Sequence, residues 1–439
     1  VSNKEGQDEL SQNIKILLYK YDSNIFDKID YEDDNIYQEP LLYAYFNSKT
    51  KKMELENIIY GYTKEILRPK KLKVKTDTYG RIYIPNIGWF IMGKKNNFYE
   101  LHKTLDGSFK FTCKNIKEDY SFEPIEIIKG TKIELLKYPI PQLEEFYYDI
   151  DGNLISVEIK KITENQKSNI HRAFKLIKKL IPKHYELIEN VTKKVVIFNV
   201  DTTLRNSFAS QNAQGISFSN AYQKDYGEVF FIDDIAHQTG HLIFNTLIYD
   251  IQKFLKIKPE TVVEKLYLDN NTTETRSVYV VFHALYTYYT TFICLDAYLD
   301  FKMKDNDKNK HEAMGRMLFY IGKCYQDISL IENNDISNVE MINDIFTENE
   351  VNAGANVFLN DILNGQTGSN TTLQLPNNLP ITENGITING MIISQNDEPL
   401  YCRCAVTEVF LFVSELGDAS ISFISVRVDT STPSSNRYK

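Results

Sequence analysis

Residues 231–244 read FIDDIAHQTGHLIF, and this stretch decides how the middle of the chain is interpreted. Its apolar residues predict a buried helix over about 230–255. His237 and His241 stand four positions apart, so on a helix they project from one face and can bind a single metal ion. The alternative is that both histidines only pack in the core. Two histidines at this spacing inside an apolar helix favour the metal site.

The residue that follows the first histidine limits the chemistry of such a site. In zinc peptidases with the motif His-Glu-x-x-His, the glutamate takes a proton from the metal-bound water. Here that position is Gln238, whose amide cannot accept the proton but can orient a water or a substrate by hydrogen bonds. We therefore expect Gln238 to act in the site without supporting zinc proteolysis, unless the glutamine was introduced to trap a substrate.

A third metal ligand is expected from a later helix, predicted over 272–302. His283 is a lone histidine in the apolar and aromatic sequence TRSVYVVFHALYTYY (275–289), where a buried imidazole needs a partner. A histidine in such a place is more often a satisfied core residue. Arg276 stands seven residues earlier, two turns along the same predicted helix, where its guanidinium could hold a carboxylate near the metal. The alternative is an arginine at a helix end.

The composition is that of a soluble globular protein with room for two domains. Lys and Arg total 50 against 59 Asp and Glu, and the net charge of −9 argues against a general nucleic-acid binder. We expect no membrane span, because no apolar run approaches the roughly 18–20 residues that a bilayer needs, and no secretory signal in the polar first residues. Five mostly distant cysteines do not suggest a disulfide framework, and Cys402 and Cys404 have a poor spacing for zinc. A cytoplasmic location is the simplest.

The pattern along the chain predicts an α+β protein with three regions. Residues 1–160 read as a mixed, β-rich part that could form a peptide-binding lobe. Residues 161–364 read as a mainly helical metal-binding core, and residues 365–439 as a linker followed by a small β-rich appendage of unknown role. The expected helices cover 8–20, 168–190, 230–255, 272–302, 311–332 and 346–364. The expected strands lie within 82–92, 109–113, 132–136, 195–200, 215–219, 386–393, 408–413 and 420–428.

Together these features resemble the HExxH-type peptide-modifying proteins of ribosomal peptide (RiPP) biosynthesis, over about residues 78–364. The similar segments are GRIYIPNIG (80–88), GTKIELLKYPIP (130–141), SFASQNAQGISFS (207–219), the HQTGH pair, and RSVYVVFHALY (276–286). This likeness implies His283 as the third metal ligand and Arg276 as an anchor for a co-substrate. Two positions depart from the family, with Gln238 in place of its glutamate and Ser277 where proline is common.

The resemblance implies an iron(II) and 2-oxoglutarate-dependent oxygenase that hydroxylates a side-chain Cβ of a precursor peptide. Burial by Phe282, Tyr286 and Tyr289 of the 272–302 helix would keep water from the site. The polar segment 207–217 leads into a strand and could present an edge to which an extended peptide adds, or it is a plain surface loop. Two other functions stay open, a zinc-dependent hydrolase and a catalytically silent peptide-binding member of the family.

Overall fold

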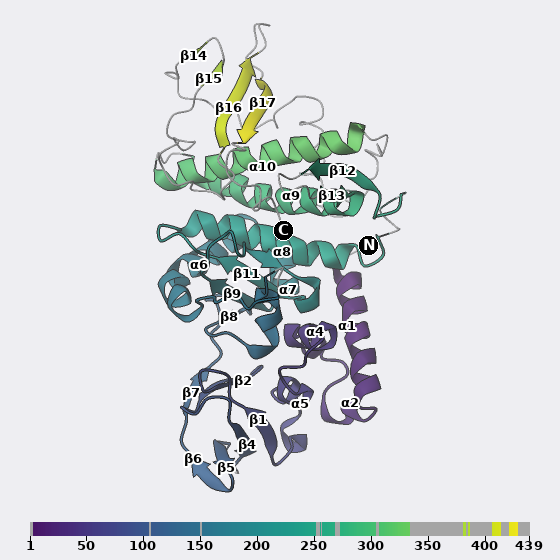
Figure 1. Ribbon diagram of the computed structural model, residues 1–439, viewed down its shortest axis with the longest axis vertical. Helices are drawn as coiled ribbons and strands as arrows, with labels where there is room; N and C mark the ends of the chain where they lie inside the picture. Colours follow the sequence, from purple (N-terminus) through teal and green to yellow (C-terminus); the bar gives the residue numbers. More distant parts are fainter. Residues whose placement is uncertain are drawn as a thin grey trace.

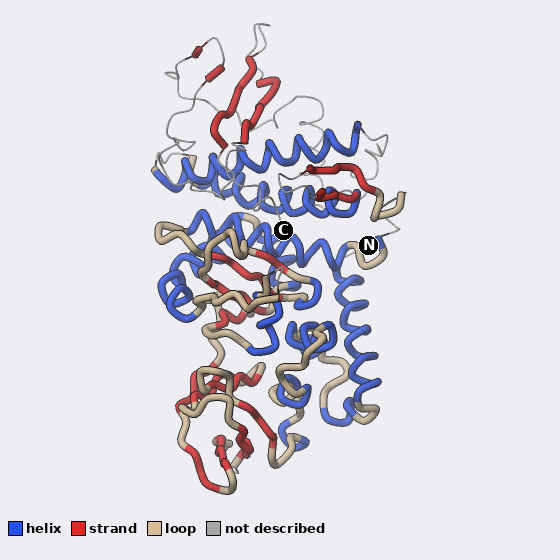
Figure 2. Tube along the Cα trace, viewed as in Figure 1, coloured by secondary structure: helices blue, strands red, loops and turns tan. Residues whose placement is uncertain are grey.

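The computed structural model describes residues 3–333, except 105–106, 150–151, 252–254, 256, 268–272 and 304–306, together with the backbone of four strands after residue 380. It is an α+β protein, as predicted. Figure 1 shows its tiers along the long axis: small β-sheets at one end, a central sheet with helices in the middle, and two long helices beyond them. Figure 2 shows short strands at the lower end of this axis and the long helices stacked above the central sheet.

Short strands of the N-terminal part form two small antiparallel sheets around one apolar core. Trp89 belongs instead to a second apolar cluster that includes residues of the central sheet, and it is buried there between the rings of Tyr83 and Tyr138, with centroids 4.6 and 5.0 Å away. The run 82–92, expected as strand, folds back on itself as a hairpin, because Asn86 has a φ of 60°. One sheet has the order β1 (Leu72–Lys75), β4 (Phe98–Lys103), β5 (Phe109–Cys113), β6 (Ile116–Glu118); the other has the order β2 (Arg81–Ile84), β3 (Gly88–Ile91), β7 (Ser121–Pro124).

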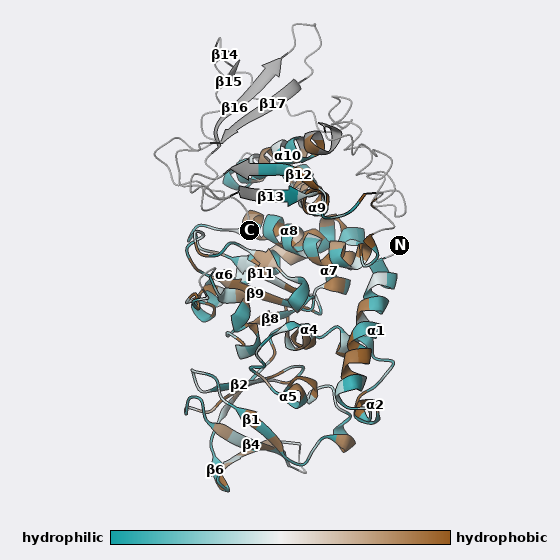
Figure 3. Ribbon diagram, turned by 45° about the vertical axis from the view of Figure 1, so that its right-hand side comes forward, coloured by the Kyte–Doolittle hydropathy of each residue, from teal (hydrophilic) through white to brown (hydrophobic). Residues whose placement is uncertain are grey.

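Helices precede these strands in the chain, and the first and longest of them runs along one side of the protein (Figure 1). Helix α1 (Asn3–Tyr21) starts earlier than the predicted 8–20, and its alternating hydrophilic and hydrophobic residues can be followed in Figure 3. A Cβ added at Gly6 would lie 1.6 Å from the carbonyl oxygen of Thr246, so the two backbones touch there. The other elements of this part are α2 (Ile25–Lys28), α3 (Asp34–Tyr37), α4 (Pro40–Asn47), α5 (Leu55–Ile59) and the 3-10 helices η1 (Glu65–Leu67) and η2 (Pro141–Tyr147).

A central sheet joins the N-terminal part to the helical core. Its order is β10 (Phe208–Ala209), β11 (Ile216–Asn220), β9 (Lys194–Phe198) and β8 (Glu134–Leu136), with β10 antiparallel at one edge and the other three parallel. Strands near 132–136, 195–200 and 215–219 were expected. Since β8 precedes residue 160 and pairs with β9 after it, the chain regions on either side of that predicted boundary share one sheet. The buried Lys194 ammonium lies between two carboxylates here, 2.7 Å from Glu134 and 3.1 Å from Glu39.

Two of the predicted helices need correction. The helix expected over 168–190 is two helices, α6 (Lys160–Leu180) and α7 (Pro182–Val191), because proline at 182 has no N–H to continue α6 and favours the first position of a new helix. The helix expected over 272–302 begins only at Val278. Residues before it form β13 (Thr273–Ser277), which pairs with β12 (Val262–Tyr267). The Ser277 hydroxyl then caps α9 (Val278–Phe301) by accepting from the Val280 N–H.

Helices α8 (Glu228–Leu247), α9 and α10 (Lys308–Asn333) form the rest of the core. Helix α8 ends before the predicted residue 255. Helix α9 is long and apolar enough to cross a membrane by length and composition, but 67% of its most apolar window is buried inside the protein, as in the core helix of a soluble protein. The predicted helix 346–364 lies outside the described residues, as do Cys402 and Cys404. The appendage contains β14 (Ile381–Thr382) and β15 (Gly385–Ile386), and the antiparallel pair β16 (Val406–Val413) and β17 (Ile421–Val428), which matches the strands expected at 408–413 and 420–428.

Candidate metal centre

Close packing of α8 against α9 brings the three predicted histidines together. At Gly240, between His237 and His241, a Cβ would lie 2.4 Å from Thr290 Oγ1 and 3.3 Å from the Thr287 Cα. The Thr290 hydroxyl also donates to the carbonyl of Ala236 on α8, at 3.0 Å. Since only glycine leaves room for this approach, the histidine-bearing turn of α8 lies directly against the turn of α9 that follows His283.

The three imidazoles form a contiguous cluster. Their ring centroids are 5.0 Å apart for His237 and His241 and 4.6 Å apart for His241 and His283. His241 Nδ1 and His283 Nε2 are 2.7 Å apart, a hydrogen bond in which one ring donates and the other accepts. All three side chains are only partly buried, so the cluster is not sealed from a ligand. The sequence interpretation that grouped these histidines therefore agrees with where the structure places them.

The surroundings favour neutral imidazoles. Burial lowers the pKa of His237 to about 4 and that of His241 to about 3, with a further lowering from the neighbouring rings. The pKa of His283 is also lowered well below its usual value, by burial and by His241. Neutral imidazole is the form that ligates a metal ion. In addition, His237 Nδ1 is buried without a hydrogen-bond partner among the described residues, which leaves one nitrogen for a ligand.

The donor set fits a transition metal, although the rings are not yet arranged around one. Imidazole nitrogens suit iron, zinc, copper and nickel. Two nitrogens bound to one metal at about 2.1 Å stand roughly 3.0–3.4 Å apart, slightly more than the 2.7 Å between His241 and His283. Within the part of the chain that the structure describes, no three His, Cys, Asp or Glu side chains already have a metal-holding geometry. Ligation therefore requires the His241–His283 hydrogen bond to open and the rings to turn.

Gln238 lies in a second polar group on α8, together with a residue that the sequence interpretation missed. Its Nε2 donates to Asp234 Oδ1 at 3.3 Å, while Gln238 Oε1 and Asp234 Oδ2 are buried without partners among the described residues. Burial raises the pKa of Asp234 to about 6, with Asp233 adding to the rise and Ser219 opposing it. The signal in the sequence was an acid one helical turn before Gln238 in an otherwise apolar helix.

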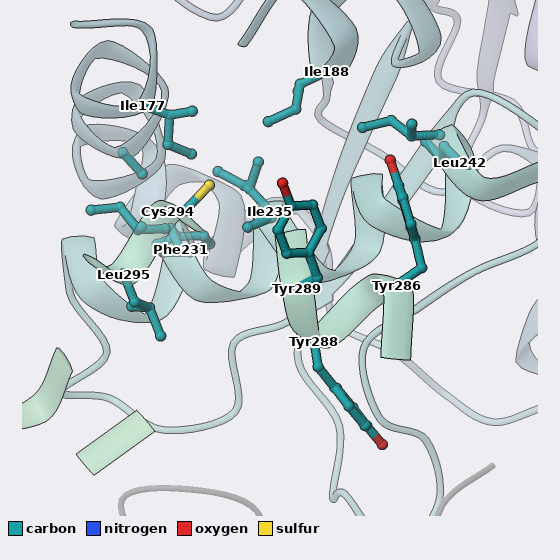
Figure 4. Packing of buried hydrophobic residues seen from close by; sticks show 14 of the residues in the cluster. Ile177, Ile188, Phe231, Ile235, Leu242, Tyr286, Tyr288, Tyr289, Cys294 and Leu295 are labelled. Atoms are coloured by element: carbon teal, nitrogen blue, oxygen red, sulfur yellow. The ribbon is translucent and has the colours of Figure 1, made fainter. Parts of the chain in front are cut away.

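Aromatic side chains from α8, α9 and α10 lie next to the histidines. The rings of Tyr288 and Tyr320 have centroids 6.1 and 5.8 Å from that of His237, and Phe244 stacks on His283 at 4.4 Å. Figure 4 shows Tyr288 pointing away from the side of α9 on which Tyr286 and Tyr289 lie. Tyr288 therefore faces the histidine and α10, whereas the other two tyrosines fill the core. Tyr286 and Tyr289, which were expected to shield the site, therefore lie on the other side of α9, and the rings next to His237 are those of Tyr288 and Tyr320.

Arg276 does not lie on the helix of His283 but on β13, which corrects the predicted placement. Its guanidinium donates to both carboxylate oxygens of Asp327 at 2.7 and 2.6 Å, and to Glu264 at 3.1 Å. Burial opposes the charge, but these carboxylates raise the pKa of Arg276 above its usual value. Burial and Asp327 raise the pKa of Tyr288, and Arg276 lowers it. The Tyr288 ring is in turn 6.1 Å from that of His237, so Tyr288 lies between this ion pair and the histidine cluster. A carboxylate co-substrate would have to displace Asp327 to use it.

A cleft of about 640 Å³ opens at the carboxyl-terminal end of α8, and none of the three histidines is among the residues that line it. The predicted docking segment 207–217 contributes Gln211 and Gln214 to its wall, in and after the 3-10 helix η3 (Gln211–Ala213). Gln211 Nε2 donates to Asn245 Oδ1 at 3.0 Å and to the Tyr279 hydroxyl at 3.2 Å. The Tyr279 ring is in turn 5.6 Å from that of His283. The cleft and the histidine cluster thus share Tyr279 as a wall.

Comparison with known proteins adds no relative to this picture. No model of a known protein family matches the chain, and no curated protein matches it either. The candidate site therefore rests on its own residues and on the geometry described above.

Proposed function

We propose that this chain is a cytoplasmic, metal-dependent oxygenase that uses iron(II) and 2-oxoglutarate to hydroxylate a side-chain Cβ of a precursor peptide. The observation that carries the proposal is the cluster of three neutral imidazoles from α8 and α9, with one buried nitrogen unpartnered. Three protein ligands leave open positions on iron for the co-substrate and dioxygen, and the oxidising chemistry would come from that bound metal.

The residues of the chain would hold the metal, orient the substrate and shield the site from bulk water. His237, His241 and His283 would be the ligands. Gln238 Oε1 has a free acceptor position, so it can orient a donor group of the substrate or a water. Tyr288 and Tyr320 beside His237 would limit the access of bulk water to the reacting atoms. Arg276 remains a predicted co-substrate anchor, on the condition that the co-substrate replaces Asp327 as its partner.

The peptide would approach along the cleft and the edge of the central sheet. Within the part of the chain that the structure describes, β10 is the last strand on its side of that sheet, and it immediately precedes the cleft wall formed by Gln211 and Gln214. An extended peptide can add to such an edge through main-chain hydrogen bonds. Because Tyr279 separates the cleft from His283, a side chain reaching past that ring would arrive at the histidines.

One observation favours a second candidate, a zinc-dependent hydrolase. Asp234, with a pKa raised to about 6, contacts Gln238 and carries an unpartnered oxygen, so it could accept a proton where the amide cannot. Peptide cleavage by the Gln238→Glu variant, with no oxygen-dependent product from the wild type, would favour this hydrolase over the oxygenase.

The decisive experiment is anaerobic reconstitution with iron(II), followed by addition of 2-oxoglutarate. We expect about one iron per chain and a weak visible charge-transfer band. Both should be lost in His241→Ala and kept in His311→Ala, a control that removes an exposed histidine of α10. Unchanged metal content in His241→Ala would mean that the cluster only packs. Tight zinc binding without the band would favour the hydrolase, or a catalytically silent binding protein if the Gln238→Glu variant also fails to cleave peptides.

A further inference from the structure

The charge of the protein is unevenly distributed along the chain. Residues 61–120 contain 13 lysines and arginines but only six aspartates and glutamates, whereas the whole chain has a net charge of −9. Most of this segment forms the two small sheets at the end of the molecule opposite α9 and α10 (Figure 1). Such a charge asymmetry indicates an interaction with an anionic partner in this region.

The strand register gathers much of the positive charge on one face of the β1–β4–β5–β6 sheet. Lys73 pairs with Glu100 and Lys75 with Phe98, and paired residues in an antiparallel sheet share a face. The opposite face is the apolar one, with Leu72, Val74, Tyr99, Leu101 and Phe111 buried in the core. Continuing the pairing through β5 and β6 defines the outer face, here called the basic face: Lys73, Lys75, Phe98, Glu100, His102, Lys110, Thr112 and Lys117.

The lysines of the basic face are available for a partner. Within the described residues, Lys73, Lys75, Lys110 and Lys117 form no ion pair with a carboxylate. The single acid of the face, Glu100, is held by Lys71 at 3.0 Å instead.

An aromatic ring lies among these lysines. Lys73 and Lys75 lie over the ring of Phe98, at 4.8 and 5.4 Å from its centroid, and that ring is 52% exposed. The lysine ammonium groups can bind the carboxylates of a ligand, and the exposed ring can contact its apolar stems.

The edge of the same sheet favours an extended chain as this ligand. Strand β1 is the first strand of the sheet, and β4 is its one strand partner among the described residues. An outer strand has backbone groups that a further strand can pair with. Along β1 the burial alternates, so that Lys73 and Lys75 point outward next to this edge. A strand added there would place its own outward side chains beside these two ammonium groups.

We propose that the basic face binds an acidic, extended peptide segment. Taking that segment as part of the peptide substrate rests on the proposed function; the binding itself does not. A long nucleic acid fits less well, because single strands are held by stacking on several aromatic rings and the basic face has one exposed ring, that of Phe98. The basic face lies apart from the histidine cluster along the long axis, so the peptide would be recognised at a place separate from the chemistry (Figure 1).

The test uses the full chain without metal and a fluorescein-labelled peptide of alternating glutamate and threonine, followed by fluorescence anisotropy. The variant Lys73→Glu/Lys75→Glu/Lys110→Glu should bind at least about tenfold more weakly than the wild type, because three attractions become repulsions. The matched control reverses three exposed lysines of α6 with the same change in net charge: Lys161→Glu/Lys175→Glu/Lys179→Glu. The control should keep wild-type affinity within about twofold, and the wild-type affinity should fall with added salt.

Other outcomes would overturn the proposal. Equal losses in both triple variants would mean that only net charge matters. An absence of peptide binding by the wild type would exclude the basic face as a site for acidic peptides, whatever the result of iron reconstitution. Tighter binding of oligothymidylate than of the peptide, lost in the same triple variant, would identify a nucleic-acid surface instead. As a second variant, Phe98→Ala should weaken peptide binding without a change in net charge.

Discussion

Replacement of Gly240 by alanine tests whether the close contact of α8 and α9 sets the position of the histidines. In a helix interior, alanine is favoured over glycine by about 1 kcal/mol. The new methyl group, however, would lie 2.4 Å from Thr290 Oγ1, and overpacking of this kind costs about 1–3 kcal/mol. We therefore expect a net loss in the free energy of unfolding of about 1 kcal/mol, and a weaker metal affinity as the two helices separate.

A double-mutant cycle isolates the contact. Thr290→Ala alone should cost about 1 kcal/mol, because it removes the hydroxyl that donates to Ala236 and Thr287. It also removes the atom that the methyl group would meet, so the double variant should be more stable than the sum of the single changes by about 1 kcal/mol. Urea unfolding followed by circular dichroism measures all four proteins. A Gly240→Ala variant that is more stable than the wild type, with no coupling to Thr290, would refute the reasoning.

Three further changes test buried charges and their partners. Lys194→Met should lower the free energy of unfolding by about 3–5 kcal/mol, because two buried carboxylates lose their cation; a loss under about 1 kcal/mol in urea unfolding would contradict this. His184 is buried, neither of its ring nitrogens has a hydrogen-bond partner among the described residues, and burial lowers its pKa to about 4. Its contribution to stability is present above about pH 6.5 and is lost as the pH falls towards 4. His184→Leu should therefore reduce the stability lost between pH 7 and 4 by roughly 3 kcal/mol, and equal losses in both proteins would argue against it. Arg276→Met should cost about 3–5 kcal/mol by leaving Asp327 unpaired, and adding Asp327→Leu should restore most of that loss; no restoration in thermal or urea unfolding would show that the pair is not the unit that matters.

Local patterns in the sequence predicted the parts of the site that lie on one helix. The spacing of His237 and His241 needs only the period of an α-helix, and the structure has both residues on α8. The contact of His241 with His283 followed from a lone histidine in an apolar stretch and from the family likeness, not from spacing. Its physical basis, the room that Gly240 leaves for Thr290, involves two residues 50 positions apart and is not visible in any short window.

The wrong placement of Arg276 also came from a contact between parts of the chain that a short window does not show. The apolar run after residue 278 made residues 273–277 look like its first turns, although Thr273 and Thr275 favour a strand. Their partner strand, β12, is a tertiary contact that periodicity does not report. Arg276 was therefore placed on the wrong element, and its carboxylate partners Glu264 and Asp327 were not foreseen. The break between α6 and α7 was missed for a local reason. Pro182 predicts a helix boundary, but the apolar residues on both sides keep a helical spacing, and this spacing favoured one continuous helix.

The position of Trp89 gives the protein a built-in optical reporter. It is the single tryptophan of the chain, and it is buried in the N-terminal part between two tyrosines. Its fluorescence therefore follows the unfolding of that part and of the apolar cluster that it shares with the central sheet, while the far-ultraviolet dichroism follows mainly the long helices of the core. Because β8 and β9 belong to one sheet, a change that loosens the core should also reach the tryptophan. Coincidence of the two signals during denaturation would measure how tightly that shared sheet couples the two ends of the molecule.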